Sequence, residues 1–429
     1  MMSEVKKNTK EKAALVPRLR FPEFRSQGGW CPEFGNMVFD QISNKDHNSD
    51  LPVLAITQEQ GAIPRDMIDY HVSVTDKSLE SYKVVEIGDF IISLRSFQGG
   101  IEFSRYRGIC SPAYVILRLR HKHSEDYFRH YLKTDRFIAQ ITKNLEGLRD
   151  GKMISYKQFS ELQLPIPPHA EQQKIADCLT SLDDLIAAES HKLDALKTHK
   201  KGLMQQLFPR EGETVPRLRF AEFREAGEWA ECELGSLTTK VGSGITPTGG
   251  DKNYKTDGRP FVRSQNIGCG QLILDDVAFI DEETHKSFDS TELKVSDVLL
   301  NITGASIGRS AVADSRIAGG NVNQHVCIIR VKHNELIPTL LNQFLISERG
   351  QKQIDSFQAG GNRQGLNFAQ IRSFEIPLPP TMKEQCRIAD CLSSLDDLIT
   401  AQTQKIETLK THKKGLMQQL FPVLDEVQA

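Results

Sequence analysis

Apolar residues recur with helical spacing in two long stretches of the chain, residues 171–209 and 384–422. In each stretch, two rows of positions spaced seven residues apart are apolar, with one polar interruption in each row. Two such rows are typical of a coiled-coil seam and not of the broader stripe of a helix that lies on a core. The apolar seam positions are Ile175, Leu179, Leu182, Ile186, Leu193, Leu196, Leu203, Leu207, Ile388, Leu392, Leu395, Ile399, Ile406, Leu409, Leu416 and Leu420.

The two stretches are copies of one another. They share the segments IADC, SLDDLI and KTHKKGLMQQLFP at one constant offset, and their polar interruptions correspond, Glu189 with Gln402 and Lys200 with Lys413. Each stretch follows proline-rich punctuation (PIPPHA or PLPPTMK) and ends at Phe-Pro, so the helix boundaries are sharp. Two amphipathic helices in unrelated cores would fit the periodicity as well, but the near-identity favours pairing of the two seams with each other.

A second, shorter motif is also doubled. VPRLRFPEFRSQGGW at residues 16–30 recurs as VPRLRFAEFREAGEW at residues 215–229, so the order of motif, variable region and helix occurs twice. A closed pseudo-twofold arrangement would place the motif at residue 16 beside the Phe-Pro near residue 420. It also requires the two helices to run antiparallel, with one variable region at each end of the pair.

The two variable regions share a pattern of strands and turns. An apolar strand after a turn (88–96 and 296–304) is followed by a glycine-containing loop and a second apolar strand (113–120 and 325–332). The sequence therefore predicts a mixed α/β (α+β) protein, with two similar domains joined by a long antiparallel two-helix coiled coil in a pseudo-twofold internal repeat. The expected boundaries are a disordered N-terminal arm at 1–15, a first domain with its short motif at 16–164, a first spacer helix at 165–214, a second domain at 215–376 and a second spacer helix at 377–429.

The bulk composition narrows the possible partners. The chain of 429 residues is 39% hydrophobic and 26% charged, and its formal net charge is −2. Nucleic-acid binding would therefore need a local basic groove on a neutral protein. There is no apolar run of membrane-spanning length and no signal-peptide core, so we expect a cytoplasmic protein without a membrane partner. The eight cysteines include no CxxC pair, which favours reduced thiols over disulfides or zinc.

Loops of the variable regions carry the candidate chemistry. Arginine reads guanine edges, glutamine and asparagine read adenine edges, and small hydroxyls in a glycine-rich loop can hold a phosphate. Each of these loops is also compatible with a plain solvated loop. The candidate DNA-binding residues are Arg95, Gln98, Arg105, Arg107, Arg149, Lys152, Ser243, Thr246, Arg263, Gln265, Asn266, Asn362, Arg363 and Gln364.

Enzymatic motifs are weak. The segment FDSTELK at residues 288–294 superficially resembles a metal-nuclease cluster, but its counterpart in the first variable region, SLESYKVVEIGD, preserves the turn and not the cluster. NITG at Asn301 lacks the aromatic residue of an amino-methyltransferase loop, and neither HExxH nor GxSxG occurs. The sequence predicts a chain that is not an enzyme by itself and has no catalytic residues, no metal site and no cofactor of its own.

The chain resembles the specificity subunit of type I restriction-modification systems over essentially its whole length. The resemblance is carried by the doubled helices, their SLDDLI cores, their KKGLMQQLFP ends and their PxPPxxEQ lead-ins (165–172 and, with one extra residue, 377–385). The resemblance implies that two target-recognition domains each bind one half of a split double-stranded DNA target. The paired helices would set the spacing and dock two methyltransferase subunits, through which motor-nuclease subunits can join.

Under this resemblance, adenine methylation, ATP-driven translocation and cleavage, with S-adenosylmethionine, ATP and Mg²⁺, would belong to the partner subunits of a phage-defence system. The recognition domains are the family's hypervariable part, so the target sequence cannot be read from these residues. A coiled-coil scaffold that joins two protein-binding domains without contacting DNA is the alternative, favoured slightly by the near-neutral charge. A stand-alone nuclease would instead require metal-dependent cleavage by the purified chain.

Overall fold

The chain folds into two compact units, Met1–Glu189 with Lys405–Ala429 (unit 1) and Ser190–Gln404 (unit 2). Each unit therefore combines one variable domain with one half of each long helix. The predicted N-terminal arm lies outside the described residues except for Leu15. The structure is a computed structural model that describes residues 15–422, apart from 49, 69–78, 144–153, 248 and 359–364.

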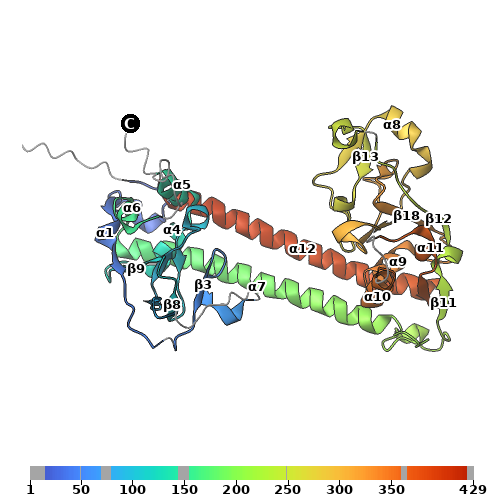
Figure 1. Cartoon of the computed structure of the whole chain (residues 1–429), viewed down its shortest axis with the longest axis horizontal. Coiled ribbons are helices and arrows are strands. Elements are labelled where there is room, and N and C mark those ends of the chain that lie inside the picture. Colours follow the sequence, from blue (N-terminus) through green and yellow to red (C-terminus); the bar gives the residue numbers. More distant parts are fainter. Residues whose placement is uncertain are drawn as a thin grey trace, which may run out of the picture. The chain divides into compact units, whose positions relative to one another are not determined.

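The two long helices are α7 (His169–Leu207) and α12 (Met382–Leu420), each of 39 residues (Figure 1). In unit 1, the start of α7 pairs with the end of α12, because Asp183 lies 2.5 Å from Lys413 and Glu189 lies 2.5 Å from Lys405. Residue numbers rise along one helix as they fall along the other, so the helices are antiparallel, as the sequence predicts.

The seam residues of both helices are all buried or half-buried. Residues near the helix ends, such as Leu179 and Leu392, are fully buried because a variable domain covers them as well. Leu182 and Leu395, which the repeat suggests as core positions, are only half-buried. Two helices side by side cover only one face of each other, which explains the partial exposure in the middle.

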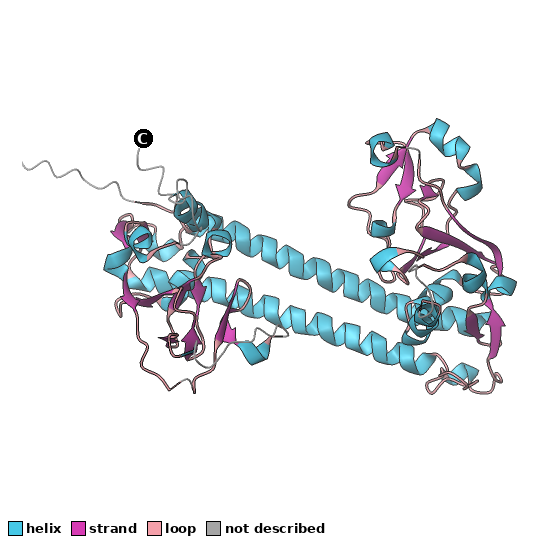
Figure 2. Cartoon of the chain, in the orientation of Figure 1, coloured by secondary structure: helices cyan, strands magenta, loops and turns pink. Residues whose placement is uncertain are grey.

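Unit 1 contains a four-stranded antiparallel sheet in the order β2-β9-β6-β7 and three two-stranded sheets, β1-β10, β3-β4 and β5-β8 (Figure 2). Its elements are β1 (Cys31–Phe34), α1 (Gly35–Val38), β2 (Phe39–Ile42), β3 (Leu54–Thr57), β4 (Gly61–Pro64), β5 (Lys83–Val85), β6 (Phe90–Ile92), α3 (Ser96–Gly99), β7 (Glu102–Phe103), β8 (Gly108–Cys110), β9 (Val115–Leu119), α4 (Glu125–Tyr131), α5 (Asp135–Lys143), α6 (Tyr156–Ser160) and β10 (Gln163–Ile166).

Unit 2 repeats this plan with a four-stranded sheet in the order β12-β18-β15-β16, a pair β11-β19 and a separate sheet β14-β13-β17. Its elements are β11 (Ala230–Glu233), β12 (Thr238–Ser243), β13 (Arg259–Val262), β14 (Ala278–Ile280), α8 (Glu282–Ser287), β15 (Val298–Asn301), β16 (Ser310–Val312), β17 (Asn321–Val322), β18 (Val326–Val331), α9 (Pro338–Leu345), α10 (Glu348–Ser356), α11 (Phe368–Arg372) and β19 (Glu375–Leu378). The mixed fold class and the internal duplication are therefore confirmed.

The core of each unit joins its sheet to the helix pair. In unit 1, the rings of Phe90, Phe128 and Phe159 each lie edge-on to Phe39, and Phe421 after the end of α12 packs on Tyr127. Aromatic contacts of this kind add about 0.5–1.5 kcal/mol beyond area burial. Within the described residues, no helix has both the length and the apolar character needed to cross a bilayer.

Candidate nucleic-acid interface

Four contacts fasten each variable domain to the helix pair, and the doubled motifs supply them. The first is a buried ion pair between the short motif and the helix lead-in. Arg20 donates to both carboxylate oxygens of Glu171 at 2.7 Å, and Arg219 donates to those of Glu384 at 2.7 and 2.8 Å. Two-pronged guanidinium–carboxylate bonds of this kind are strong and geometrically specific. The pairs explain why VPRLRF and PxPPxxEQ are doubled together.

The second contact uses the next residue of the lead-in. The side-chain oxygen of Gln172 accepts a hydrogen bond from Ser124 N (2.9 Å), and that of Gln385 accepts one from Ile337 N (3.0 Å). Ser124 and Ile337 are the residues that precede helices α4 and α9. A long helix therefore holds the start of a domain helix in both units.

The third contact closes the repeat. Leu19 N donates to Gln419 O near the end of α12 in unit 1, and Leu218 N donates to Gln206 O near the end of α7 in unit 2, both at 3.0 Å. The short motif at residue 16 thus lies beside the Phe-Pro after α12, as the closed pseudo-twofold arrangement predicts.

The fourth contact involves the polar interruptions of the seam. Lys413 pairs with Asp183 at 2.5 Å and Lys200 with Asp396 at 2.6 Å. In unit 2, Asp396 also accepts from Gln343 of α9 at 2.7 Å.

In unit 1, His130 of α4 takes the place of Gln343, with Nδ1 at 3.8 Å from Asp183. Burial, with the positive charge of Lys413 nearby, lowers the pKa of His130 to about 3.

A doubled ion pair inside the domains was missed by sequence reasoning. Buried Asp89, in the turn before β6, receives two 2.8 Å bonds from Arg118 on β9, and buried Asp297, before β15, receives two 2.7 Å bonds from Arg330 on β18. These bonds raise the pKa of both arginines. Only the Gly-Asp and Ser-Asp turns were visible in the sequence, because the partner arginines lie about thirty residues further on.

The candidate DNA-binding residues of unit 1 fall at opposite ends of the four-stranded sheet. Gln98 on α3 and Arg95, the residue before α3, are both exposed. They follow β6, at the edge where Ile92 is opposite the start of β9. Arg105 and Arg107 follow β7, which runs antiparallel to β6, so they lie at the other edge. There Arg107 pairs with Glu86. The sequence offered these four residues on two separate loops, and the strand directions place the two loops at opposite ends of the sheet.

In unit 2, the corresponding edge lies where β12 and β15 end and β18 begins. Ser243 is opposite Cys327, and Asn301 is opposite Val326. Thr246 follows in the loop after β12. We call this edge, and the edge of unit 1 that carries Arg95 and Gln98, the variable edge of each unit.

The variable edge of unit 2 also carries residues that sequence reasoning missed. Thr303 Oγ1 lies 2.5 Å from Nδ1 of His325, and Nε2 of the same ring lies 3.1 Å from the exposed amide of Gln324. The chain is tightly folded here, since a Cβ on Gly244 would lie 1.6 Å from Val322 O. The end of one strand and the start of its antiparallel neighbour lie at the same edge of a sheet. Applied to β15 and β18, this rule could have identified the segment NQH at 323–325 from the sequence.

The loop after β13 is bound to the same edge. Asn301 donates to Ser264 O at 2.8 Å, and Asn323 N donates to Val262 O at 3.0 Å. Gln265 is exposed and donates to Asp276 at 2.7 Å. The structure therefore brings Gln265 together with the Ser243 loop and Gln324.

Asn266 requires a correction. It is only 1% exposed. Its oxygen accepts from Arg263 N, and its amide donates to Ile273 O and Asp276 O. With both ends of the amide used to shape the loop, Asn266 cannot read a base in this conformation. Arg263 is also held, by Asp276 and by the Tyr254 ring 5.4 Å away.

Five further candidates, Arg149, Lys152, Asn362, Arg363 and Gln364, lie outside the described residues. Among the residues that are described, no group of three or more His, Cys, Asp or Glu side chains is placed to hold a metal ion.

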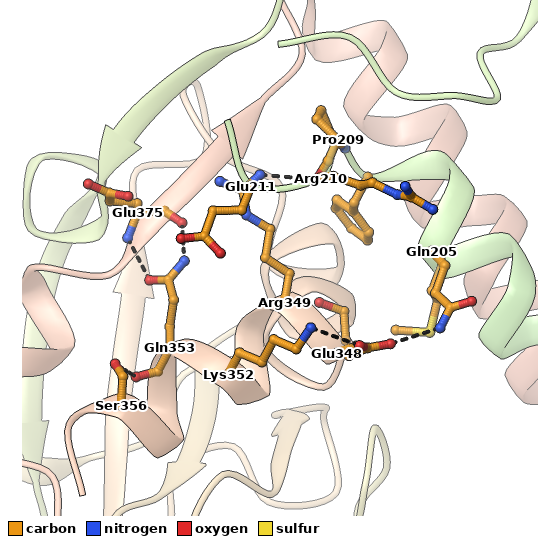
Figure 3. Close-up of a pocket in the computed structure, with 13 residues that line it drawn as sticks. Gln205, Pro209, Arg210, Glu211, Glu348, Arg349, Lys352, Gln353, Ser356 and Glu375 are labelled. Carbon is orange, nitrogen blue, oxygen red and sulfur yellow. Dashed lines mark hydrogen bonds and ion pairs between the residues drawn. The ribbon is translucent and has the colours of Figure 1, made fainter. Parts of the chain in front are cut away.

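A cavity of about 630 Å³ in unit 2 lies between the end of α7 and helix α10 (Figure 3). Some of its charged side chains already have partners within the chain. Glu348 accepts from Gln205 at 2.8 Å and pairs with Lys352 at 2.9 Å, while Arg349 donates to Pro209 O at 3.1 Å. This pairing makes the cavity a weaker candidate for DNA than the variable edges.

Two copies of one domain plan, each fastened to a shared helix pair and each presenting a variable edge, define a duplicated recognition protein. The model of the type I restriction modification DNA specificity domain matches residues 34–198 and 226–411. The chain therefore belongs to the family of type I restriction-modification specificity subunits. Such subunits are non-catalytic targeting subunits whose catalytic partners are other chains, and membership implies DNA together with methyltransferase and restriction subunits as partners.

Among its relatives, the specificity subunit of the type I restriction enzyme MjaVIII from Methanocaldococcus jannaschii is 25% identical over 82% of this chain and 81% of its own length. The EcoBI specificity subunit of Escherichia coli is 23% identical over 62% of this chain and 58% of its own. The S subunit structure from M. genitalium matches with a TM-score of 0.57 at 15% identity, covering 95% of this chain and 99% of that one.

A chain from a study of assembly and conformational transition in the type I R-M system matches with a TM-score of 0.55 at 17% identity, covering 92% of this chain and 98% of that one. The two solved structures support the fold. A scaffold that does not bind DNA is not favoured by these comparisons.

Proposed function

We propose that the variable edge of each unit binds one half of a bipartite double-stranded DNA target, and that the helix pair sets the distance between the halves. One observation carries this proposal. Three of the fastening contacts are the same in both units, and the fourth differs in having His130 in unit 1 against Gln343 in unit 2. The variable edges differ throughout, with Arg95 and Gln98 in unit 1 against Gln265 and Gln324 in unit 2. A common scaffold with two different reading surfaces is what two different half-sites require.

The exposed amides supply the chemistry of base reading. A glutamine side chain can pair with the N6 and N7 atoms of adenine in the major groove, and such a contact discriminates by about 1–3 kcal/mol. Nearby arginines and hydroxyls would hold phosphates, which makes complex formation weaken with salt.

Methylation sequencing of cells that carry this subunit and its methyltransferase tests the proposal. The wild type should return a two-part target. Gln98→Ala should relax one half and Gln324→Ala the other, because each residue belongs to one unit. Gln173→Ala, an exposed glutamine on α7, is the matched control and should leave the target unchanged. A change in both halves from a single variant would contradict the assignment.

We further propose that the helix pair docks two methyltransferase subunits, through which motor-nuclease subunits join. Leu185 and Leu398 support this, because they occupy equivalent places in the two SLDDLI segments and are 41% and 54% exposed. Exposed leucines that recur with the same neighbours, Asp184 and Asp397, suit two copies of one partner. Leu185→Asp should reduce the bound methyltransferase from two copies to one, whereas Val295→Asp, at an exposed valine outside the two long helices, should not.

A further inference from the structure

Both long helices contain a glycine that the chain itself does not explain. Gly202 of α7 and Gly415 of α12 occupy equivalent positions in the KKGLMQQLFP segment, five residues before each helix ends. Neither has the positive φ that favours glycine. Apart from proline, glycine is the least favourable residue in a helix interior, because it loses the most backbone freedom on folding. Its occurrence in both copies needs a cause.

Close packing within the chain explains other glycines, such as Gly100 and Gly35. A Cβ on Gly100 would lie 2.2 Å from Leu132 O, and a Cβ on Gly35 would lie 2.4 Å from Phe159 O. At Gly202 and Gly415, by contrast, no described atom lies within 4 Å of the Cβ position outside the excluded local backbone. The space beside these two glycines is therefore available to another molecule.

The residues around each glycine are exposed and the same in both copies. Thr198 and Gln205 flank Gly202 on its face of α7, and Thr411 and Gln418 are their equivalents on α12. Exposed residues nearer the middle of the helices differ between the copies, since His191 is Gln404 and Ala195 is Thr408 in the other copy. An exposed surface that stays identical around both glycines indicates a shared external partner.

Each glycine also lies close to the proposed docking leucine of the same unit. In unit 2, Gly202 is two residues beyond Lys200, and Leu398 is two residues beyond its partner Asp396. In unit 1, Gly415 and Leu185 have the same relation to the Lys413–Asp183 pair. Because the helices are antiparallel, these two steps lead in opposite directions, so the glycine of one helix and the leucine of the other are offset by four residues, or about 6 Å along the pair.

We propose that Gly202 and Gly415 are two equivalent crossing points at which a helix of a methyltransferase subunit approaches α7 or α12 at short range. The inference rests on the proposed docking of methyltransferase subunits and deepens it. A helix without a side chain at the crossing point allows the partner's backbone to come close. The exposed lysines Lys197 and Lys201 call for acidic side chains on the partner helix beside Gly202. Their equivalents Lys410 and Lys414 pair with Glu407 and Asp135 of this chain.

The test compares Gly202→Gln, Gly415→Gln and the double variant with the full-length wild type, each mixed with purified methyltransferase subunit. Bound copies are counted by analytical ultracentrifugation, and thermal unfolding is recorded in parallel. Ala187→Gln is the matched control, because it adds the same side chain at an exposed helix position where the copies differ (Ala187 against Thr400).

We expect each single glycine variant to bind one methyltransferase subunit normally and the second at least tenfold more weakly, and the double variant to lose both. All variants should keep or raise the melting temperature, because glutamine is a better helix former than glycine. The control should bind two copies.

Two full-affinity copies on the glycine variants, or a lowered melting temperature, would overturn the inference. Weakened DNA binding with unchanged methyltransferase binding would also overturn it and would assign this face to DNA. If the wild type bound no methyltransferase, the proposed docking itself would fail.

Discussion

The regions that fasten the two domains and the regions proposed to read DNA differ in how closely the two units agree. The Arg20–Glu171 and Arg219–Glu384 pairs have almost the same bond lengths, and the glutamines that follow both hold the start of a domain helix. At the variable edges, no such agreement remains. A protein can therefore exchange its reading surface while keeping its attachment, provided that the attachment is made by residues outside that surface.

The largest expected effect comes from breaking one fastening contact. Glu171→Ala leaves Arg20 buried without its partner, and loss of one member of a buried pair costs about 3–5 kcal/mol. Glu384→Ala should cost a similar amount, because the two sites are equivalent. Urea unfolding of both variants measures this. Glu23→Ala, which removes an exposed partner of Lys174, should leave the free energy of unfolding unchanged. Clearly unequal costs for the two buried glutamates would break the equivalence of the units.

The seam should give a graded response. Leu179→Ala removes a fully buried side chain and should cost about 2–5 kcal/mol, whereas Leu182→Ala removes a half-buried one and should cost roughly half as much. Leu392→Ala and Leu395→Ala should show the same order in unit 2. An equal cost at positions 179 and 182 would mean that further contacts cover the middle of the seam.

A smaller effect distinguishes the units by pH. Because the pKa of His130 is lowered to about 3 in the folded chain, the unfolded chain binds more protons between about pH 3 and pH 6.5. The contribution of neutral His130 to the free energy of unfolding is therefore present above about pH 6.5. It is lost as pH falls through this window, at up to about 1.4 kcal/mol per pH unit. His130→Gln, which copies Gln343 of unit 2, should flatten this dependence. If His130→Gln leaves the pH profile of the free energy of unfolding unchanged, the protonation of His130 does not depend on its contact with Asp183.

The smallest change is expected from moving the chain ends. A permuted chain that joins residue 422 to residue 16 through a flexible linker and opens the chain near Gly212 should fold and direct the same methylation. The reason is that Leu19 already binds Gln419 as Leu218 binds Gln206. Failure of this permutant to fold would show that the two junctions are not equivalent.

The sequence was most informative where the repeat is most exact. Seven-residue spacing predicted α7 and α12, and the doubled VPRLRF motif predicted the closure seen at Leu19. The candidate site was less accessible, because residue types do not show which edge of a sheet a loop occupies. The sequence offered Arg95 and Arg105 as candidates on two loops, and the antiparallel β6-β7 pairing places them at opposite ends of the sheet. The side chain of Asn266 is of the type that reads adenine, but its amide is hydrogen-bonded to the backbone of its own loop.

The most direct test of the central claim lengthens the helix pair. One heptad inserted after Ala188 and one after Ala401 keeps the seam and adds about 10 Å to the pair at 1.5 Å per residue. At 3.4 Å per base pair, the spacer of the methylated target should grow by roughly three base pairs, while both half-sites stay the same. Methylation sequencing of the insertion variant gives both answers at once. An active enzyme that keeps its original spacer would contradict the role of the helices in setting the distance.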